Sequence, residues 1–316
     1  MPAYLNAMAF ALGEVERTVE EADALGLLIS GAAALRAAGF ARQHACADGT
    51  TAYDLARRAV EPLRPHLAGT GAILYATCIP ANANLGDPAR FAATGDVKFL
   101  MDFPGSHLQA EFGLDDAFVL GVNQQACTGL LGALRLADLL LAGEPGLQSA
   151  LCVTADRFPP GAKYEQAYNL ISDGAAAMVV GRKPAGYRIL ACHARTNGAW
   201  AHASDDETVG TFFNHTHRFV GETLAKAGLS AGDLAAIVTQ NMNVKAWQIL
   251  SRLLGIGFDK VAFPTLGEVA HMISGDNIAN LQRLEAEGRV RAGDKFLLLM
   301  SGYGLNWQGV VLEKYP

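Results

Sequence analysis

The order of apolar runs, polar turns and helical segments in the first half of this chain recurs in the second half, and this repetition constrains the fold most strongly. Several short apolar runs, each with the length and flanks of a buried strand, have a counterpart in the other half. Paired across the halves, they are residues 72–76 with 235–239, 117–122 with 261–265, 149–155 with 295–300, and 175–181 with 308–313. Because helical segments separate many of these strands, parallel pairing with right-handed crossovers is expected. The sequence therefore predicts an α/β chain of two pseudo-symmetric halves, residues 1–183 and 184–316.

The repetition also places Cys127 and His271 at corresponding positions. Cys127 follows a strand and a polar turn, at the start of a segment that runs with helical spacing to Gly143. His271 is expected at the start of a helix that ends before Gly288. Because the two positions are related by the pseudo-twofold axis of such a fold, the two side chains are predicted to face one another in one site.

The sequence context of Cys127 favours a nucleophile. A thiol at the start of a helix lies at the positive end of the helix dipole, which favours the thiolate and lowers the pKa. Small residues at positions 126, 128 and 129 leave space for a substrate beside the sulfur. The alternative, a cysteine packed in the core, is the usual state of a free cysteine. We assign it to the others, Cys46, Cys78, Cys152 and Cys192.

A glycine-rich stretch near the C-terminus, residues 301–309, lies between two of the predicted strands. Glycines in such a turn allow the backbone to approach a ligand closely. We therefore predict that the backbone N–H groups of Gly304 and Cys127 form an oxyanion hole, a pair of donors that stabilises a tetrahedral intermediate. A glycine-rich turn alone is weak evidence for an oxyanion hole, and the prediction depends on its pairing with Cys127.

The polar turn 240–243 supplies further candidates for the same site. Gln240 is a candidate amide donor and Asn243 a candidate for substrate support, although a helix cap is an equally good interpretation of both. Lys245 is a candidate for attracting a phosphate or an acidic carrier protein, with a solvated lysine as the simpler alternative.

Composition excludes several classes of protein. The chain carries 25 Lys and Arg against 31 Asp and Glu, a net charge of -6, which argues against a nucleic-acid partner. We find no apolar run of the roughly 20 residues that a membrane span needs, so no membrane association is expected. The 5 cysteines are dispersed, without the spacing of a metal site, and are predicted to be reduced thiols in a cytoplasmic protein.

Five stretches of the chain resemble the beta-ketoacyl-acyl-carrier-protein synthase III family of the thiolase superfamily, in that family's order. They are residues 73–80, 126–129, 172–180, 222–230 with the strand that follows, and 301–309. The resemblance implies a thiolase-like five-layered α/β/α/β/α fold, and a homodimer or a heterodimer with a related subunit. It also implies an acyl-cysteine intermediate, formed from a thioester of coenzyme A (acyl-CoA) or of phosphopantetheinyl acyl carrier protein (ACP), with no metal and no other cofactor.

The chain departs from the family pattern at two site positions. The family has a histidine at the head of a His-Gln-Ala-Asn stretch, where this chain has Gln240. The family's asparagine, after a strand and turn of the second half, is matched by the region of His271. The amide and the imidazole have thus exchanged positions. Condensation needs two donors that hold an enolate in a defined geometry, whereas a single histidine suffices as the general base of acyl transfer.

We therefore predict an acyltransferase that carries an acyl group on Cys127 and passes it to a small hydroxyl or amine acceptor in specialised metabolism. His271 is the expected general base, and Gln240 the amide donor. Two alternatives remain open: decarboxylative condensation of the acyl-enzyme with a malonyl or beta-keto thioester, or an inactive subunit that shapes the pocket of a related partner. The presence of Cys127 argues against the inactive subunit.

Overall fold

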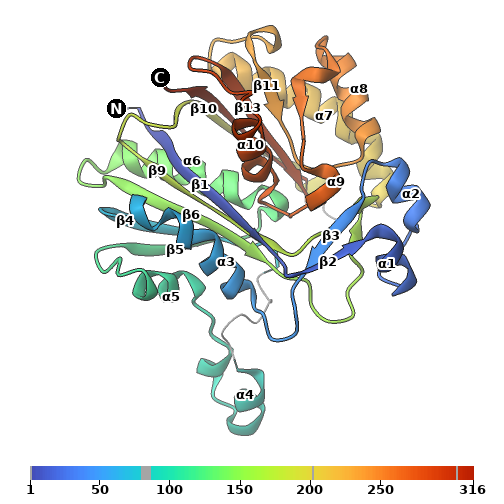
Figure 1. The fold of residues 1–316 in the computed structure, drawn as a ribbon. Coiled ribbons are helices and arrows are strands. Elements are labelled where there is room, and N and C mark those ends of the chain that lie inside the picture. Colours follow the sequence, from blue (N-terminus) through green and yellow to red (C-terminus); the bar gives the residue numbers. More distant parts are fainter. Residues whose placement is uncertain (1, 80–86, 201–202, 304) are drawn as a thin grey trace.

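The structure, a computed structural model, describes residues 2–79, 87–200, 203–303 and 305–316. Within these residues the main sheet has 10 strands (Figure 1). In spatial order they are β12 (Val261–Ala262), β11 (Ala236–Val238), β13 (Lys295–Gly302), β14 (Asn306–Lys314), β10 (Tyr187–Thr196), β1 (Tyr4–Leu12), β9 (Gly174–Gly181), β6 (Ser149–Asp156), β4 (Thr70–Ala76) and β5 (Phe118–Val122). Two small antiparallel sheets lie outside it. One pairs β2 (Val15–Thr18) with β3 (Arg42–Ala45), and the other is a hairpin of β7 (Glu165–Gln166) and β8 (Asn169–Leu170).

The sheet is symmetric about its centre, because each strand of the first half has its equivalent strand at the same distance on the other side. Outward from β1 the strands are β9, β6, β4 and β5, and outward from β10 they are β14, β13, β11 and β12. β1 and β10 pair antiparallel at the centre, where Tyr4 lies opposite Arg188. β4 pairs parallel with both of its neighbours, and so does β11. All the runs that were paired in the sequence occupy equivalent positions, which confirms the predicted α/β fold of two pseudo-symmetric halves.

Outer helices cover one face of each half. α3 (Ala52–Val60) and α5 (Pro104–Glu111) pack on the first half, against Ile73 and Tyr75 of β4 and their neighbours. α7 (Asp205–Lys226) and α8 (Val244–Leu254) pack in the same way on the second half. Four shorter helices are α1 (Val19–Ala24), α2 (Ala32–Ala37), α4 (Pro88–Thr94) and α9 (Leu266–Val269).

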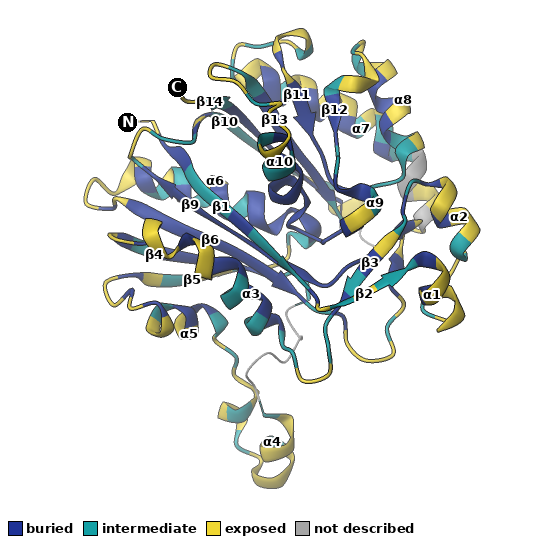
Figure 2. Cartoon of the chain, in the orientation of Figure 1, coloured by how far each residue is buried: buried dark blue, intermediate teal, exposed yellow. Residues whose placement is uncertain are grey.

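Two further helices lie between the halves. α6 (Gly129–Gly143) and α10 (Asp276–Ala286) pack against the opposite faces of the same strands, for example against Leu74 of β4 and Leu298 of β13. Figure 2 shows much of α10 and the central strands in the buried colour. Because strand side chains alternate between the two faces, each sheet half is covered on both sides, as expected for a five-layered α/β/α/β/α fold.

The apolar composition of α6 reflects its place in the core. The window Ala126–Gly143 is long and apolar enough by composition to cross a membrane, which the sequence analysis overlooked. Half of that window is buried inside the fold, where α6 packs on β4 and β6.

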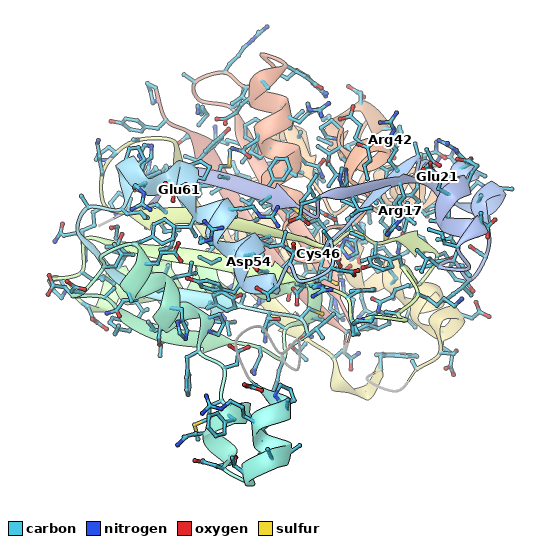
Figure 3. The ribbon with its side chains drawn as sticks, turned by 60° about the horizontal axis from the view of Figure 1, so that its bottom comes forward. Arg17, Glu21, Arg42, Cys46, Asp54 and Glu61 are labelled. Atoms are coloured by element: carbon cyan, nitrogen blue, oxygen red, sulfur yellow. The ribbon has the colours of Figure 1, made fainter. Side chains whose placement is uncertain are left out.

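Local sequence signals determine where several helices begin. Thr18 and Glu21 form a capping box at α1, and Thr51 and Asp54 form one at α3. Glu21 and Asp54 are labelled in Figure 3, at the two helix starts on this side of the molecule. In contrast, the helix predicted to begin at His271 begins at Asp276. The prediction was wrong because the backbone between the two residues is irregular.

Candidate active site

Cys127 lies at the entrance of α6 and is held in a tight turn. The chain leaves β5, passes through residues 123–125, and forms a short 3-10 turn, Ala126–Thr128, before α6 begins. Ala126 adopts φ 45, a left-handed conformation that alanine rarely takes. Such backbone strain often accompanies a functional site, because the surrounding structure must hold it in place.

His271 is held by the other half of the molecule. Its N–H donates to the carbonyl of Leu170 at 2.9 Å, and its carbonyl accepts from the N–H of Ser172 at 2.9 Å. The preceding residue, Ala270, has φ 58. The histidine therefore lies in a strained loop that is pinned to β8, and the first half of the chain fixes the position of its backbone.

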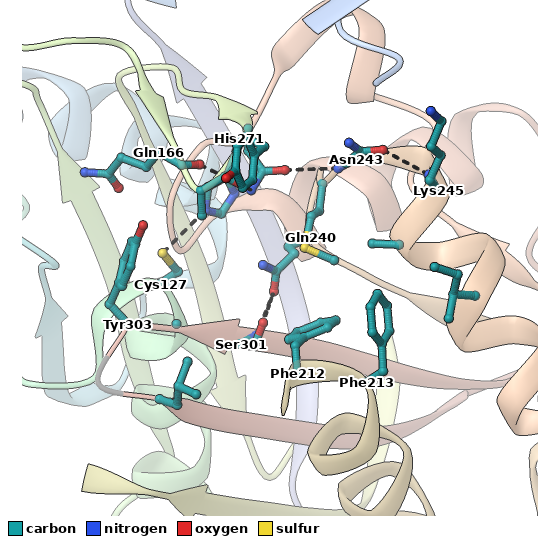
Figure 4. Close-up of a pocket in the computed structure, with 18 residues that line it drawn as sticks. Cys127, Gln166, Phe212, Phe213, Gln240, Asn243, Lys245, His271, Ser301 and Tyr303 are labelled. Atoms are coloured by element: carbon teal, nitrogen blue, oxygen red, sulfur yellow. Dashed lines mark hydrogen bonds between the residues drawn. The ribbon is translucent and has the colours of Figure 1, made fainter. Parts of the chain in front are cut away.

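The structure brings the two predicted side chains together. Nε2 of His271 lies 3.4 Å from Sγ of Cys127, and the pair faces a cavity (Figure 4). On its other side, Nδ1 of His271 lies 2.5 Å from Oδ2 of Asp276. Asp276 is fully buried and also accepts from the N–H groups of Asn241 at 2.7 Å and Met272 at 2.6 Å. Cys127, His271 and Asp276 thus form a continuous line.

The carboxylate of Asp276 determines which nitrogen of the His271 ring carries the proton. Asp276 accepts hydrogen bonds from two backbone donors, as an ionised carboxylate does. In a neutral imidazole, a proton on Nδ1 of His271 would donate to this carboxylate and leave the lone pair of Nε2 facing Cys127. This is the arrangement in which a histidine can take a proton from a thiol.

Asp276 was not among the predicted site residues. The residue lies five positions after His271, in a stretch that was expected to be regular helix. In an α-helix those two side chains would not point toward each other. The loop with left-handed Ala270 and Ile273 (φ 45) turns the histidine back onto the first turn of α10. Gly275 lies in this loop with φ -96, but the two left-handed positions, Ala270 and Ile273, carry no glycine that would have indicated the turn.

The thiol of Cys127 is not activated in the way the sequence predicted. A hydrogen bond with Cys78 and burial raise the pKa of the Cys127 thiol well above its ordinary value. The predicted lowering of this pKa is therefore wrong, because the sulfur is buried beside a second thiol and near the carboxylates of Asp276 and Asp156. Removal of the proton must come from a neighbouring base, and His271 is the base in contact with the sulfur.

Gln240 lines the same cavity, with its amide held in one orientation. Its Oε1 accepts from the N–H of Ser301 at 2.7 Å and from the hydroxyl of Ser301 at 3.1 Å. Because both donors meet the oxygen, the NH₂ group is directed to the opposite side, and Figure 4 shows it pointing toward Cys127.

The other predicted site residues lie farther from the sulfur or outside the described residues. The side chain of Asn243 accepts from the N–H of Lys245 at 3.0 Å and caps α8, which agrees with the structural interpretation. Lys245 is exposed on the cavity rim. Gly304 lies outside the described residues. Its neighbour Gly302 approaches the backbone of the cysteine turn.

Gly302 has no room for a side chain, which gives a direct test of the cysteine turn. A Cβ at this position would lie 2.8 Å from the backbone nitrogen of Cys127 and 3.0 Å from Cβ of Ala126. We expect Gly302→Ala to displace the turn and slow acylation of Cys127 by about 10- to 100-fold, since small misplacements are costly in catalysis. The rate is measured by intact mass after mixing with acyl-CoA. Gly143→Ala, where a Cβ meets open space, is the control, and equal rates for the two variants would contradict the prediction.

The cavity is mostly apolar and has a volume of about 300 Å³. Its apolar wall comes from α7, α8 and the chain around them, and its polar groups gather near Cys127 and at the rim (Figure 4). The β7–β8 hairpin forms another wall, to which the sequence analysis assigned no role. The lining residues include Gln166, Tyr168, Asn169, Phe212, Phe213, Met242, Ile249 and Leu305. Among the residues that the structure describes, no three His, Cys, Asp or Glu side chains form a group that could hold a metal ion.

A buried carboxyl, Asp156, holds the segment that carries Cys78. Its Oδ1 accepts from the hydroxyl of Thr77 at 2.7 Å and from the N–H groups of Cys78 and Ile79, both at 2.9 Å. Burial raises the pKa of Asp156 to about 6, although these hydrogen bonds oppose the shift. The carboxyl therefore has a pKa of about 6, well above the pKa of an aspartate in the unfolded chain.

The sign of this shift predicts how stability depends on pH. Between about pH 4 and pH 6 the unfolded chain releases the Asp156 proton before the folded chain does, so the free energy of unfolding falls as pH rises. Because the pKa of Asp156 is raised by about two, the free energy of unfolding falls by about 3 kcal/mol in total, and the whole of this loss is reached above about pH 7. Asp156→Asn, which keeps an acceptor oxygen, should remove this component. We expect the difference in urea unfolding free energy between variant and wild type to change by that amount between pH 4 and pH 7.5, and a pH-independent difference would contradict the assignment.

Comparison with known proteins agrees with the fold. Residues 123–198 match the family model for 3-oxoacyl-[acyl-carrier-protein (ACP)] synthase III, and residues 224–314 match the model for the C-terminal part of that enzyme. Together the two models cover more than half of the chain. A beta-ketoacyl-ACP synthase III from Cereibacter sphaeroides is 26% identical over 299 residues, covering 87% of this chain and 88% of the relative. One from Rhodobacter capsulatus is 27% identical over 324 residues, covering 94% and 95%.

Solved structures share the whole fold at lower identity. ChlB3, described as an acyltransferase, superimposes with a TM-score of 0.83 at 21% identity, covering 100% of this chain and 98% of its own. The beta-ketoacyl-ACP synthase III of Thermus thermophilus gives 0.81 at 22% identity, covering 98% of both chains. OleA of Xanthomonas campestris gives 0.80 at 18% identity, covering 99% and 97%.

The family defines a reaction type. Its synthase III enzymes take acyl groups from CoA or ACP thioesters on an active-site cysteine and use no cofactor. The two family models, the matches along almost the full chain and the shared thiolase fold lead to one conclusion. The chain belongs to the 3-oxoacyl-ACP synthase III family, also called beta-ketoacyl-ACP synthase III, of the thiolase superfamily.

Proposed function

We propose that this member of the family is an acyltransferase of specialised metabolism, in which Cys127 takes an acyl group from a CoA or ACP thioester and a small hydroxyl or amine acceptor removes it. The line of Cys127, His271 and Asp276, with separations of 3.4 and 2.5 Å, carries the proposal. Nε2 of His271 faces the thiol as an acceptor, which suits a general base. In the family's condensing arrangement the histidine instead donates a hydrogen bond to the substrate carbonyl.

The first half-reaction loads the cysteine. Nε2 of His271 takes the thiol proton, and the sulfur of Cys127 attacks the thioester carbonyl. The backbone N–H of Cys127 supports the oxyanion, together with the predicted donor Gly304. When the tetrahedral intermediate collapses, the C–S bond to CoA or ACP breaks, and the leaving thiolate takes the proton from His271. Asp276 stabilises the imidazolium while it exists.

The second half-reaction uses the same base. The acceptor gives its O–H or N–H proton to Nε2 of His271 and attacks the acyl carbonyl, after which Cys127 leaves as a thiolate and regains the proton. The products are an ester or amide and the free enzyme. Gln240 is directed at this space and would donate to the acyl or acceptor oxygen. Lys245 on the rim would meet a phosphate of CoA or of the phosphopantetheine arm.

Similarity to ChlB3, which is described as an acyltransferase, supports the proposal. One observation favours a second candidate, decarboxylative condensation with a malonyl thioester. The cavity still presents one amide and one imidazole, from Gln240 and His271, and the relatives in sequence are condensing synthases. An inactive partner subunit is the least supported alternative, because the pair of Cys127 and His271 is aligned for chemistry.

One experiment distinguishes the two candidate reactions, acyl transfer and decarboxylative condensation. The protein is loaded with acetyl, butyryl or benzoyl groups from their CoA thioesters, desalted, and mixed either with a panel of amines, amino alcohols and monosaccharides or with malonyl-CoA. We expect loss of the acyl mass and formation of an ester or amide with a member of the panel, without release of carbon dioxide from malonyl-CoA. Release of carbon dioxide at the rate of acyl loss would instead establish condensation.

We also propose that the protein is a cytoplasmic homodimer or a heterodimer with a related subunit, joined along β5. This strand pairs only with β4 among the described strands, and its Phe118 and Leu120 are each 39% exposed. Leu120→Lys is expected to convert a dimer into a monomer in size-exclusion chromatography with light scattering, because it places a charge on an apolar edge. Leu253→Lys, on the exposed face of α8, is the control. A wild-type monomer would contradict the proposed homodimer.

A further inference from the structure

A closed ring of buried polar side chains lies behind His271. Asn241, Thr265 and Asn280 come from the end of β11, the start of α9 and the middle of α10, and each is at most 1% exposed. Nδ2 of Asn241 donates to Oγ1 of Thr265 at 3.0 Å, and Oγ1 of Thr265 donates to Oδ1 of Asn280 at 2.7 Å. Nδ2 of Asn280 closes the ring by donating to Oδ1 of Asn241 at 3.0 Å.

Asn241 connects this ring to both sides of the imidazole. Its side chain donates to the carbonyl of Ala270, the strained residue directly before His271, at 2.6 Å. Its backbone N–H donates to Oδ2 of Asp276 at 2.7 Å, the same oxygen that contacts Nδ1 of His271. One residue therefore holds both the peptide that carries the histidine and the carboxylate that orients it.

The other hydrogen bonds of these three side chains go to backbone groups, so none of the three side chains can rotate freely. Asn280 donates to the carbonyl of Thr239 at 2.9 Å and accepts from the N–H of Thr265 at 3.0 Å. Each side-chain polar atom of the three residues thus has a partner. A fully satisfied buried network has a defined geometry, whereas a partly satisfied one is costly.

We propose that Asn241, Thr265 and Asn280 are positioning residues, which keep Nε2 of His271 directed at the sulfur of Cys127. None of them lines the cavity, so they act through His271 and Asp276 without touching substrate. The inference rests on the proposed function, in which His271 is the general base. It goes beyond that function by assigning the alignment of the base to a ring that spans β11, α9 and α10.

The test is the pH dependence of Cys127 alkylation by iodoacetamide, followed by peptide mass in the full-length protein. Asn241→Ala removes the donors to Thr265 and Ala270 and keeps the backbone bond to Asp276. We expect the alkylation rate at neutral pH to fall about 10- to 100-fold and the midpoint of the profile to move to higher pH, because a misaligned base no longer takes the thiol proton. Thr265→Val, which has nearly the same shape, is the second variant and should shift the profile in the same direction.

Asn277→Ala is the matched control. Asn277 lies on the same helix with 1% exposure, and its side chain donates to the carbonyls of Val238 and Leu299, which belong to strands β11 and β13 and not to the loop of His271. Its loss should lower stability and leave the alkylation profile unchanged. If Asn277→Ala shifts the profile as Asn241→Ala does, or if Asn241→Ala and Thr265→Val both match the wild type, the inference is wrong. If His271→Ala itself leaves alkylation unchanged, the proposed general base fails instead, so the two failures are distinguishable.

Discussion

Replacing His271 by alanine is expected to slow the acylation of Cys127 by about 10⁴-fold, or about 5.5 kcal/mol in activation free energy. The reason is the raised pKa of the Cys127 thiol, which leaves little thiolate at neutral pH unless a base takes the proton. The imidazole 3.4 Å from the sulfur is that base. Single-turnover acylation by acetyl-CoA, followed by intact mass, measures the effect. Added imidazole should restore part of the rate by filling the space left by the side chain.

His193→Ala is the matched control for this experiment. His193 is half-buried, and its Nε2 lies 3.3 Å from a carboxylate oxygen of Glu222, so its contact resembles that of His271 with Asp276. It lies outside the cavity lining, and its loss should leave acylation at the wild-type rate. Acylation of His271→Ala within about tenfold of wild type would contradict the role of general base.

Asp276→Asn is the second large effect, with an expected loss of about 10³- to 10⁴-fold in the rate of acylation. The amide has nearly the shape of the carboxylate but brings an NH₂ group, which can face Nδ1 of His271. The imidazole proton then moves to Nε2, where it meets the thiol as a donor and can no longer accept a proton from it. Both oxygens of Asp276 accept backbone N–H groups, from Asn241 and Met272, so the NH₂ group also faces one of these donors and the variant is expected to be less stable than the wild type.

Asp173→Asn controls for the loss of a buried carboxylate. Asp173 is fully buried and accepts from the N–H groups of Cys46 and Phe158 and from the hydroxyl of Tyr164. It contacts neither Cys127 nor His271 in these hydrogen bonds, so its substitution should lower stability without a comparable loss of acylation. Equal losses in both variants would mean that Asp276 acts through stability alone.

The sequence was sufficient for the fold and for the central pair of the site. Repeated apolar runs identified the equivalent strands, because a duplicated α/β chain places equivalent runs at equivalent positions in the sheet. The same repetition brought Cys127 and His271 to one place. Both inferences depend on the repeated order of apolar runs in the two halves, which can be read directly from the sequence.

The remaining features of the site depend on local backbone geometry, which residue types did not reveal. Asp276 reaches His271 only because Ala270 and Ile273 take left-handed conformations that a pattern search assigns to glycine. The pKa of Cys127 depends on Cys78, a neighbour distant in sequence that looked like an ordinary core cysteine. The β7–β8 hairpin lines the cavity with residues that follow no periodic pattern.

The most direct test of the central claim is the mass of the intact protein after brief incubation with a set of acyl-CoA and acyl-ACP thioesters. The proposed chemistry requires one added acyl group on wild-type protein, located on Cys127 by peptide mapping, and no addition to Cys127→Ala. The adduct should survive in the presence of malonyl-CoA and disappear when a hydroxyl or amine acceptor is supplied. Unmodified wild-type protein across the whole set, or an acyl group on any residue other than Cys127, would contradict it.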